Sequence, residues 1–174
     1  MPTDPLTVGI LSSIAGALAL ESTRRLYPSF TIDGTPWKGK QANREVVAIS
    51  VIQAGKLVLM TKRNPEAQDV HLDWCFPSAR IKPNENIIER IKKRYQEKFN
   101  IEVKVIKKIG EREIPNKGEK LVYFHCKHDR GTLDNKDPEE NSLVEWVDPS
   151  EAQKRAGSFI ANNVVKLIKK IEVS

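Results

Sequence analysis

The sequence predicts a mixed α/β sandwich, in which helices cover a sheet. The first observation is a segment of helical periodicity, residues 86–99, between strand-like segments that are rich in β-branched residues. Its apolar residues recur at three- and four-residue steps, which indicates one buried face: Ile87, Ile88, Ile91, Tyr95 and Phe99. A second apolar stripe of this spacing lies near the C-terminus, at residues 159–171. The order of hairpin, strand, helix, several strands and helix is typical of a layered α/β domain.

The first predicted element of the domain is a β-hairpin. Residues 45–52 are rich in β-branched side chains, Ala54-Gly55 forms a turn, and residues 57–60 return as the second arm. A polar loop then leads to a short strand at residues 74–76. That strand is expected to stop at Pro77, with a loop from there to the helix.

Further strands and a last pair of helical segments follow the central helix. Strands are predicted at residues 101–109 (continuing toward Ile114), 120–127 and 143–147, separated by a turn at 115–118 and a polar segment at 129–141. The sequence Asp148-Pro149-Ser150-Glu151 is a helix start signal.

Chain length and charge limit the classes of protein to consider. A chain of 174 residues suits one domain with a short appendage. The formal net charge of +6 favours anionic partners such as nucleotides, nucleic acid or acidic lipid, although mild basicity is also common among cytoplasmic proteins. Cys75 and Cys126 form no metal-binding pattern, which predicts buried free thiols in a reducing compartment.

The N-terminus differs in composition from the rest of the chain. Residues 5–20 carry no charge and, as a helix, would span about 24 Å against a hydrocarbon core of about 30 Å. Gly9, Ser13 and Ala17 repeat every four residues, as small residues do where membrane helices pack closely. Residues 1–22 are therefore interpreted as an apolar helix that anchors the chain to a membrane, with the main domain on its cytoplasmic face.

Other interpretations of this helix remain open. It can dock on the domain, or it can associate with copies of itself, which predicts a homo-oligomer. Ala17-Leu18-Ala19 resembles a signal-peptide cleavage site, but no Lys or Arg precedes the apolar segment. Residues 23–42 are predicted to be a connector, and residues 43–174 the domain.

A motif surrounds the central helix. Trp74-Cys75-Phe76-Pro77 is followed by Ala79, Glu85 and the segment Lys93–Ile101, which covers the last turns of the helix and the two residues after it. Glu145-Trp146-Val147 comes later. In spacing, residues 43–172 resemble a Nudix hydrolase domain, whose signature is Gly, five residues, Glu, seven residues and Arg-Glu-aliphatic-x-Glu-Glu-x-Gly-aliphatic. The resemblance implies an α/β/α sandwich with a mixed sheet and nucleotide phosphate chemistry.

The motif departs from the family where the family binds metal. The family's three helix carboxylates fall on Arg94, Glu97 and Lys98, so that Glu97 alone is retained. Glu85 is expected to be structural, in contact with Lys93. One carboxylate between two cations is a poor Mg²⁺ site, so the sequence predicts no metal, no cofactor and no catalytic residue.

The substituted cations suggest binding in place of hydrolysis. Fixed cations can hold a phosphate directly, which predicts a sensor or effector that binds a nucleotide or another phosphate-bearing small molecule. The predicted ligand-binding residues are Arg94, Lys98, Lys93, Arg80 and Arg90. The competing interpretation is a solvated helix face whose cations pair with Glu89 and Glu97.

Two alternatives come from other functional classes. One is an active, Mg²⁺-dependent Nudix hydrolase of nucleoside diphosphate derivatives, which takes its carboxylates from elsewhere: Glu111, Glu113, Glu139 or Glu140. The other is a structural subunit that only contacts a protein or RNA. Binding to nucleic acid rests on charge alone. His125 and His128 would point to opposite faces of a strand, which argues against a metal site there.

Overall fold

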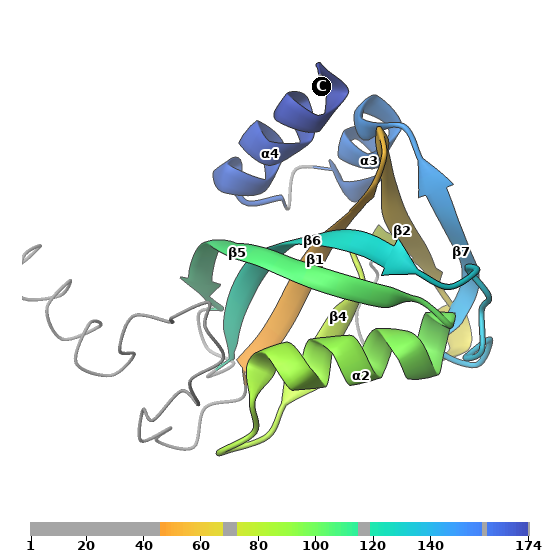
Figure 1. Ribbon diagram of the computed structural model, residues 1–174, viewed down its shortest axis with the longest axis vertical. Helices are drawn as coiled ribbons and strands as arrows, with labels where there is room; N and C mark the ends of the chain where they lie inside the picture. The colour runs from red at the N-terminus through yellow and green to blue at the C-terminus, as the bar shows by residue number, and fades with distance from the viewer. Residues whose placement is uncertain (1–45, 68–72, 115–118, 158–159, 174) are drawn as a thin grey trace, which may run out of the picture.

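The computed structural model describes residues 46–67, 73–114, 119–157 and 160–173. A mixed sheet lies between helix α2 (Ile87–Phe99) on one face and helices α3 (Pro149–Ala156) and α4 (Asn162–Glu172) on the other (Figure 1). This arrangement confirms the α/β/α sandwich. The predicted apolar helix at residues 1–22 and the connector at 23–42 lie outside the described residues. Within the described ranges, no helix is long and apolar enough to cross a membrane.

The sheet has seven strands in the order β3-β2-β1-β6-β5, with β4 paired to β1 and β7 paired to β2. Their bounds are β1 Val46–Ala54, β2 Leu57–Arg63, β3 Trp74–Cys75, β4 Ser78–Ile81, β5 Glu102–Glu113, β6 Lys120–Arg130 and β7 Asn141–Val147. Strand β1 runs parallel to β6, and the other pairs are antiparallel, so the sheet is mixed.

Alternation along β6 divides the hydrophobic core into two layers. Val122, Phe124 and Cys126 face α2, whereas Leu121 and Tyr123 face α4. The α2 layer takes the predicted helical stripe, with Ile87, Ile91, Tyr95 and Phe99 buried, and the other layer takes Val164, Leu167, Ile168 and Ile171 of α4.

The histidines of β6 follow the same alternation. His125 contacts Gln53 at 3.0 Å, and His128 lies edge-on to Trp146 with ring centroids 5.6 Å apart. The two rings therefore lie on opposite faces, as predicted. Both cysteines are free thiols, Cys126 buried and Cys75 half-buried.

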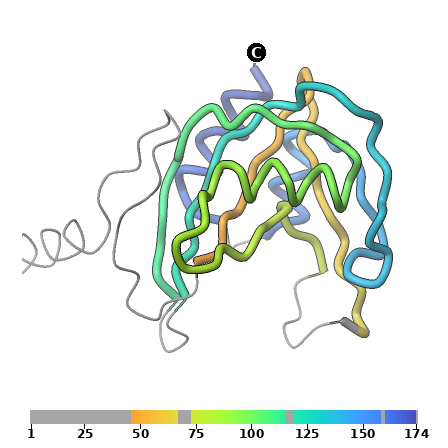
Figure 2. The backbone as a smooth tube through the Cα atoms, turned by 60° about the horizontal axis from the view of Figure 1, so that its bottom comes forward, coloured from red at the N-terminus to blue at the C-terminus, as the bar shows by residue number. Residues whose placement is uncertain are grey.

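Helix α2 agrees with its prediction at both ends. The side chain of Asn86 accepts hydrogen bonds from the backbone N–H groups of Ile88 (3.0 Å) and Glu89 (3.2 Å), which is the N-cap geometry. Asn100 ends the helix in the left-handed conformation at φ 57°. In Figure 2 the helix lies across the sheet, and Tyr95 fixes it there by donating a hydrogen bond to the carbonyl oxygen of Pro77 at 3.1 Å.

The prediction of a loop directly after Pro77 was wrong, because Ser78–Ile81 forms strand β4. Ser78 and Ala79 pair with Ile49 and Ala48 of β1. Pro77 has no N–H to donate, but its carbonyl oxygen accepts the N–H of Ser50 at 2.9 Å. The proline therefore ends one strand pairing, and the extended chain begins another.

The remaining boundaries differ by a few residues. Strand β6 continues beyond Lys127 to Arg130, and β5 reaches Glu113. A 3₁₀ turn, Pro65–Ala67, occupies part of the predicted polar loop. The predicted turn at 115–118 lies outside the described residues.

Candidate functional site

The loop after β6, residues 131–140, is bound to the C-terminal end of α2. The backbone N–H of Asp134 donates to the carbonyl oxygen of Phe99 at 3.0 Å, and that of Lys136 donates to the carbonyl oxygen of Lys98 at 2.9 Å. These carbonyls are free acceptors because the helix ends there. The loop is therefore held against the last turn of the helix that carries the motif.

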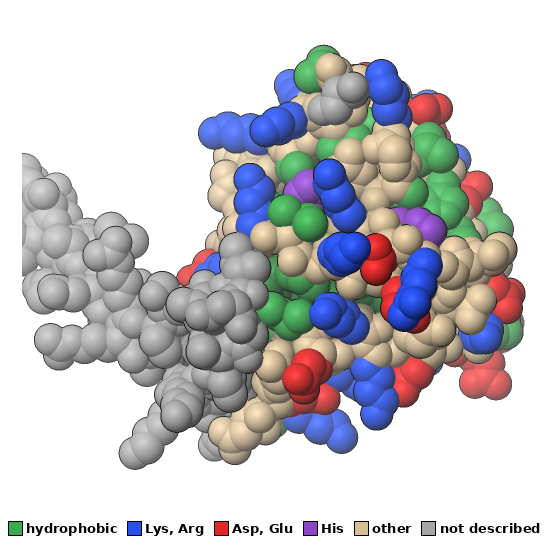
Figure 3. Space-filling view, in the orientation of Figure 1, with side chains coloured by type: hydrophobic (Ala, Val, Ile, Leu, Met, Phe, Trp, Pro, Cys, Tyr) green, Lys and Arg blue, Asp and Glu red, His purple; other side chains and the backbone are tan. Residues whose placement is uncertain are grey.

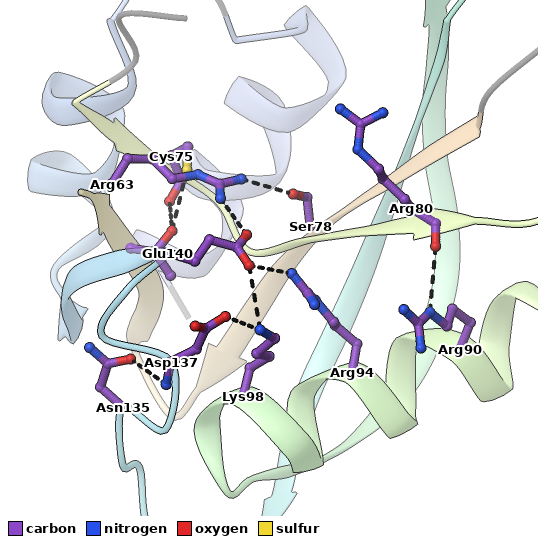
Figure 4. A network of polar contacts seen from close by, with 11 residues as sticks. Arg63, Cys75, Ser78, Arg80, Arg90, Arg94, Lys98, Asn135, Asp137 and Glu140 are labelled. Atoms are coloured by element: carbon purple, nitrogen blue, oxygen red, sulfur yellow. Dashed lines mark hydrogen bonds and ion pairs between the residues drawn. The ribbon is translucent and has the colours of Figure 1, made fainter. Parts of the chain in front are cut away.

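This loop places two carboxylates against the cations of the motif (Figure 4). One oxygen of Glu140 accepts a hydrogen bond from Arg94 at 2.6 Å and lies 3.6 Å from the Lys98 ammonium. The other oxygen is bound by Arg63, and Lys98 also binds Asp137. These five side chains, from β2, α2 and the loop, are called the Glu140 cluster below.

Besides Asp137 of the loop, Arg63 is the member of the Glu140 cluster that sequence reasoning missed. It ends β2 at a register shift in the pairing with β7, where Arg63 lies opposite Asn141. Register shifts of this kind change the direction of a side chain. The Arg63 guanidinium also lies 3.4 Å from the hydroxyl of Ser78. No motif signals this residue. The available sequence signal was an arginine at the polar end of a buried strand.

The electrostatics of the Glu140 cluster are nearly self-compensated. The side chains of Arg63, Arg94 and Lys98 are only 22–25% exposed. Burial alone would raise the pKa of the Glu140 carboxyl, but Arg94 and Arg63 outweigh it, and the pKa of Glu140 lies below its ordinary value. Three cations face two carboxylates, which leaves one positive charge in excess.

The other three predicted ligand-binding residues do not join Glu140. Arg90 donates to the carbonyl oxygen of Arg80 at 3.5 Å, and Arg80 pairs with Glu119 at 3.3 Å. Lys93 pairs with Glu97 at 3.9 Å on the exposed side of α2. Of the five predicted cations, the structure brings Arg94 and Lys98 together at one site.

One predicted ion pair was wrong, and the predicted pairing along the helix face holds only in part. Glu85 accepts the backbone N–H of Lys82 at 2.9 Å and lies 3.7 Å from Arg90, not against Lys93. It keeps a structural role by closing the turn before the helix. Glu97 pairs with Lys93 of its own helix, as the competing interpretation expects, but Arg94 and Lys98 pair with the loop carboxylates Glu140 and Asp137.

The residues fit Mg²⁺ poorly. Two of the three helix positions at which the resemblance places carboxylates carry cations, and the oxygens of Glu140 are already bound by Arg63 and Arg94. Glu111, another candidate carboxylate, lies on β5 between Lys108 at 2.5 Å and Lys120 at 2.8 Å. In the described ranges of the chain, His, Cys, Asp and Glu form no group of three or more suited to a metal.

Residues 42–168 match the family described as NUDIX domain. The chain belongs to the Nudix family. No curated protein shows significant similarity to it in sequence.

Solved structures of Nudix proteins share the fold. A NUDIX hydrolase from Nitrosomonas europaea is 17% identical with a TM-score of 0.62, covering 74% of this chain and 72% of that one. A NUDIX-family hydrolase from Clostridium perfringens is 15% identical (TM-score 0.56; 75% and 98% covered). An ADP-ribose pyrophosphatase from Streptococcus suis is 12% identical (TM-score 0.53; 76% and 94% covered). At these identities the likeness shows the fold.

Proposed function

We propose that this Nudix domain binds a phosphate-bearing, nucleotide-derived ligand without hydrolysing it. The observation that carries the proposal is the convergence of Arg63, Arg94 and Lys98 on one carboxylate, that of Glu140. Cations that hold a carboxylate in this geometry can hold a phosphate oxygen in the same way. The name of one similar structure, an ADP-ribose pyrophosphatase, supports a nucleotide-derived ligand class.

The same residues argue against hydrolysis. A bound metal ion activates water by lowering its pKa, whereas a guanidinium or ammonium group supplies positive charge alone. Glu97 has a side chain that is 50% exposed and pairs with Lys93, away from the Glu140 cluster. Arginine offers a planar fork for two phosphate oxygens, and lysine adds a point charge. These are the parts of a binding site.

Metal-independent binding tests this proposal. We expect a ligand from a nucleotide panel to raise the melting temperature equally with Mg²⁺ and with EDTA. Arg94→Glu should weaken binding of this ligand at least about tenfold. The change removes the guanidinium, which makes a charge-assisted hydrogen bond in this site, and places a negative charge beside the phosphate. Lys92→Glu, an exposed change on the same helix, is the matched control and should bind as the wild type does.

The two alternatives correspond to distinct results of the same assay. Mg²⁺-dependent release of phosphate or mononucleotide that is lost in Glu97→Gln would establish an active hydrolase. A panel in which no nucleotide changes the melting temperature would favour a structural subunit.

We also propose that residues 5–20 attach the protein to a membrane, or join it to copies of itself. The support is the uncharged composition and the spacing of small residues. We expect the full chain either to sediment with membranes and need detergent for release, or to elute as an oligomer without detergent. A variant that begins at residue 43 should stay in the supernatant as a monomer. Recovery of the full chain as a detergent-free monomer would contradict both forms of this proposal.

A further inference from the structure

We infer that the group anchored at this site is a terminal phosphate, a phosphate monoester, and that it takes the place of the Glu140 side chain between Arg63, Arg94 and Lys98. The inference rests on the proposed function, because it names the chemistry of the ligand at the same site. Glu140 then acts as a resident anion that occupies the site until a stronger anion arrives.

Charge and oxygen count favour a monoester. Without the Glu140 carboxylate, Arg63, Arg94 and Lys98 face Asp137 alone, which leaves two positive charges in excess. A terminal phosphate carries between about 1.5 and 2 negative charges at neutral pH and has three acceptor oxygens, one for each cation. A phosphodiester carries one negative charge, no more than the carboxylate that it must displace.

The attachment of Glu140 allows its side chain to leave while its backbone stays. Its carbonyl oxygen accepts the N–H of Asn64 at 3.0 Å, and the next residue, Asn141, donates its N–H to the carbonyl oxygen of Asp137 at 3.0 Å. The Glu140 side chain is 30% exposed, so one side of it already meets water. Rotation about its side-chain bonds therefore frees Arg63 and Arg94 without movement of the loop.

Asp137 keeps the site assembled during this exchange. It binds Lys98 independently of Glu140, and its side chain is 15% exposed. The side chain of Asn135 accepts the backbone N–H of Asp137 at 3.2 Å, which fixes the turn that carries it (Figure 4). Lys98 therefore stays oriented toward the site after Glu140 has left.

Removal of the resident anion is the direct test. In Glu140→Gln we expect adenosine 5′-monophosphate and inorganic phosphate to bind at least about tenfold more tightly than in the wild type, measured by calorimetry in EDTA. Adenosine 3′,5′-cyclic monophosphate, a diester, should bind the wild type at least about tenfold more weakly than the 5′-monophosphate does. Glu140→Ala, which also removes the carboxylate, is the second variant if the glutamine variant does not fold, and the same direction of change is expected.

Glu111→Gln is the matched control, because Glu111 also bridges two cations, Lys108 and Lys120, but on β5. Equal tightening in this variant would overturn the inference, since the loss of one negative charge elsewhere on the domain would then explain it. Unchanged or weaker binding of the 5′-monophosphate in Glu140→Gln would also overturn the inference. If binding were still lost in Arg94→Glu, the proposed function would remain supported. Equal binding of diester and monoester would overturn the monoester assignment. If no nucleotide of a broad panel bound either the wild type or Glu140→Gln, the proposed function would be overturned as well.

Discussion

Gly131→Ala is expected to lower the free energy of unfolding by about 3 kcal/mol, measured by urea denaturation. Gly131 follows β6 with φ at +96°, a conformation that side chains with a Cβ rarely adopt. A Cβ at this position would lie 2.3 Å from the carbonyl oxygen of Asn100 and 3.1 Å from the Cα of Ile101. Both neighbours are backbone atoms at the end of α2, so neither can move aside without moving the helix or the loop.

Gly55→Ala is the matched control for this prediction. Gly55 also has a positive φ, +58°, in the turn between β1 and β2, but no atom lies within 4 Å of the added Cβ. The free energy of unfolding should fall by about 1 kcal/mol in Gly55→Ala, because only the cost of a positive φ for alanine applies there. Equal losses in the two variants would show that close contact at Gly131 contributes nothing.

The effect of Gly131→Ala should extend to the Glu140 cluster. The loop that Gly131 begins carries Asp137 and Glu140, and it reaches α2 through the backbone bonds of Asp134 and Lys136. A shift of the loop start alters the approach of Glu140 to Arg94. Stability and ligand binding should therefore decline together in Gly131→Ala, and Gly55→Ala should leave binding unchanged.

The helix and most strands were predictable because their signals are local. The three- and four-residue spacing from Ile87 to Phe99 fixes the buried face of α2, and Asn86 supplies its cap. Strand β4 was missed because Pro77 is a strand-ending residue in isolation. Only the pairing of Ser78 and Ala79 with β1, 29 and 31 residues earlier in the chain, makes that segment a strand.

Two cations of the site, Arg94 and Lys98, were predictable, but their partners were not. The family spacing located Arg94 and Lys98, because the motif is carried by one helix. Glu140 lies 46 residues from Arg94 and 77 from Arg63, so their contacts depend on the loop path and on the end of β2. Ion pairs at such separations leave no periodic pattern in a sequence. The ligand-binding cations were therefore predicted without the carboxylates that hold two of them, Arg94 and Lys98.

His125 should make the fold sensitive to mild acid. The residue is 8% exposed, and its ring lies against Gln53. Burial, reinforced by the charges of Lys107, Lys127 and Lys170, lowers the pKa of His125 to about 4 from an ordinary value near 6.5. Between these two pH values the unfolded chain binds a proton at His125 that the folded chain does not. The contribution of His125 to the free energy of unfolding is therefore fully present above pH 6.5. It decreases as the pH falls toward 4, by about 2 to 3 kcal/mol in total.

His125→Gln isolates this contribution, because glutamine does not titrate and can still contact Gln53. Urea denaturation from pH 7 to 4 should give a nearly flat free energy down to about pH 4.5 for this variant, whereas the wild type declines. Carboxylates with lowered pKa, such as Glu140 and Glu111, lose their contribution only below about pH 4.5, so the two effects occupy separate ranges. His128→Gln retains His125 and should retain the decline. A wild-type slope that persists in His125→Gln would place the acid-sensitive group elsewhere in the chain.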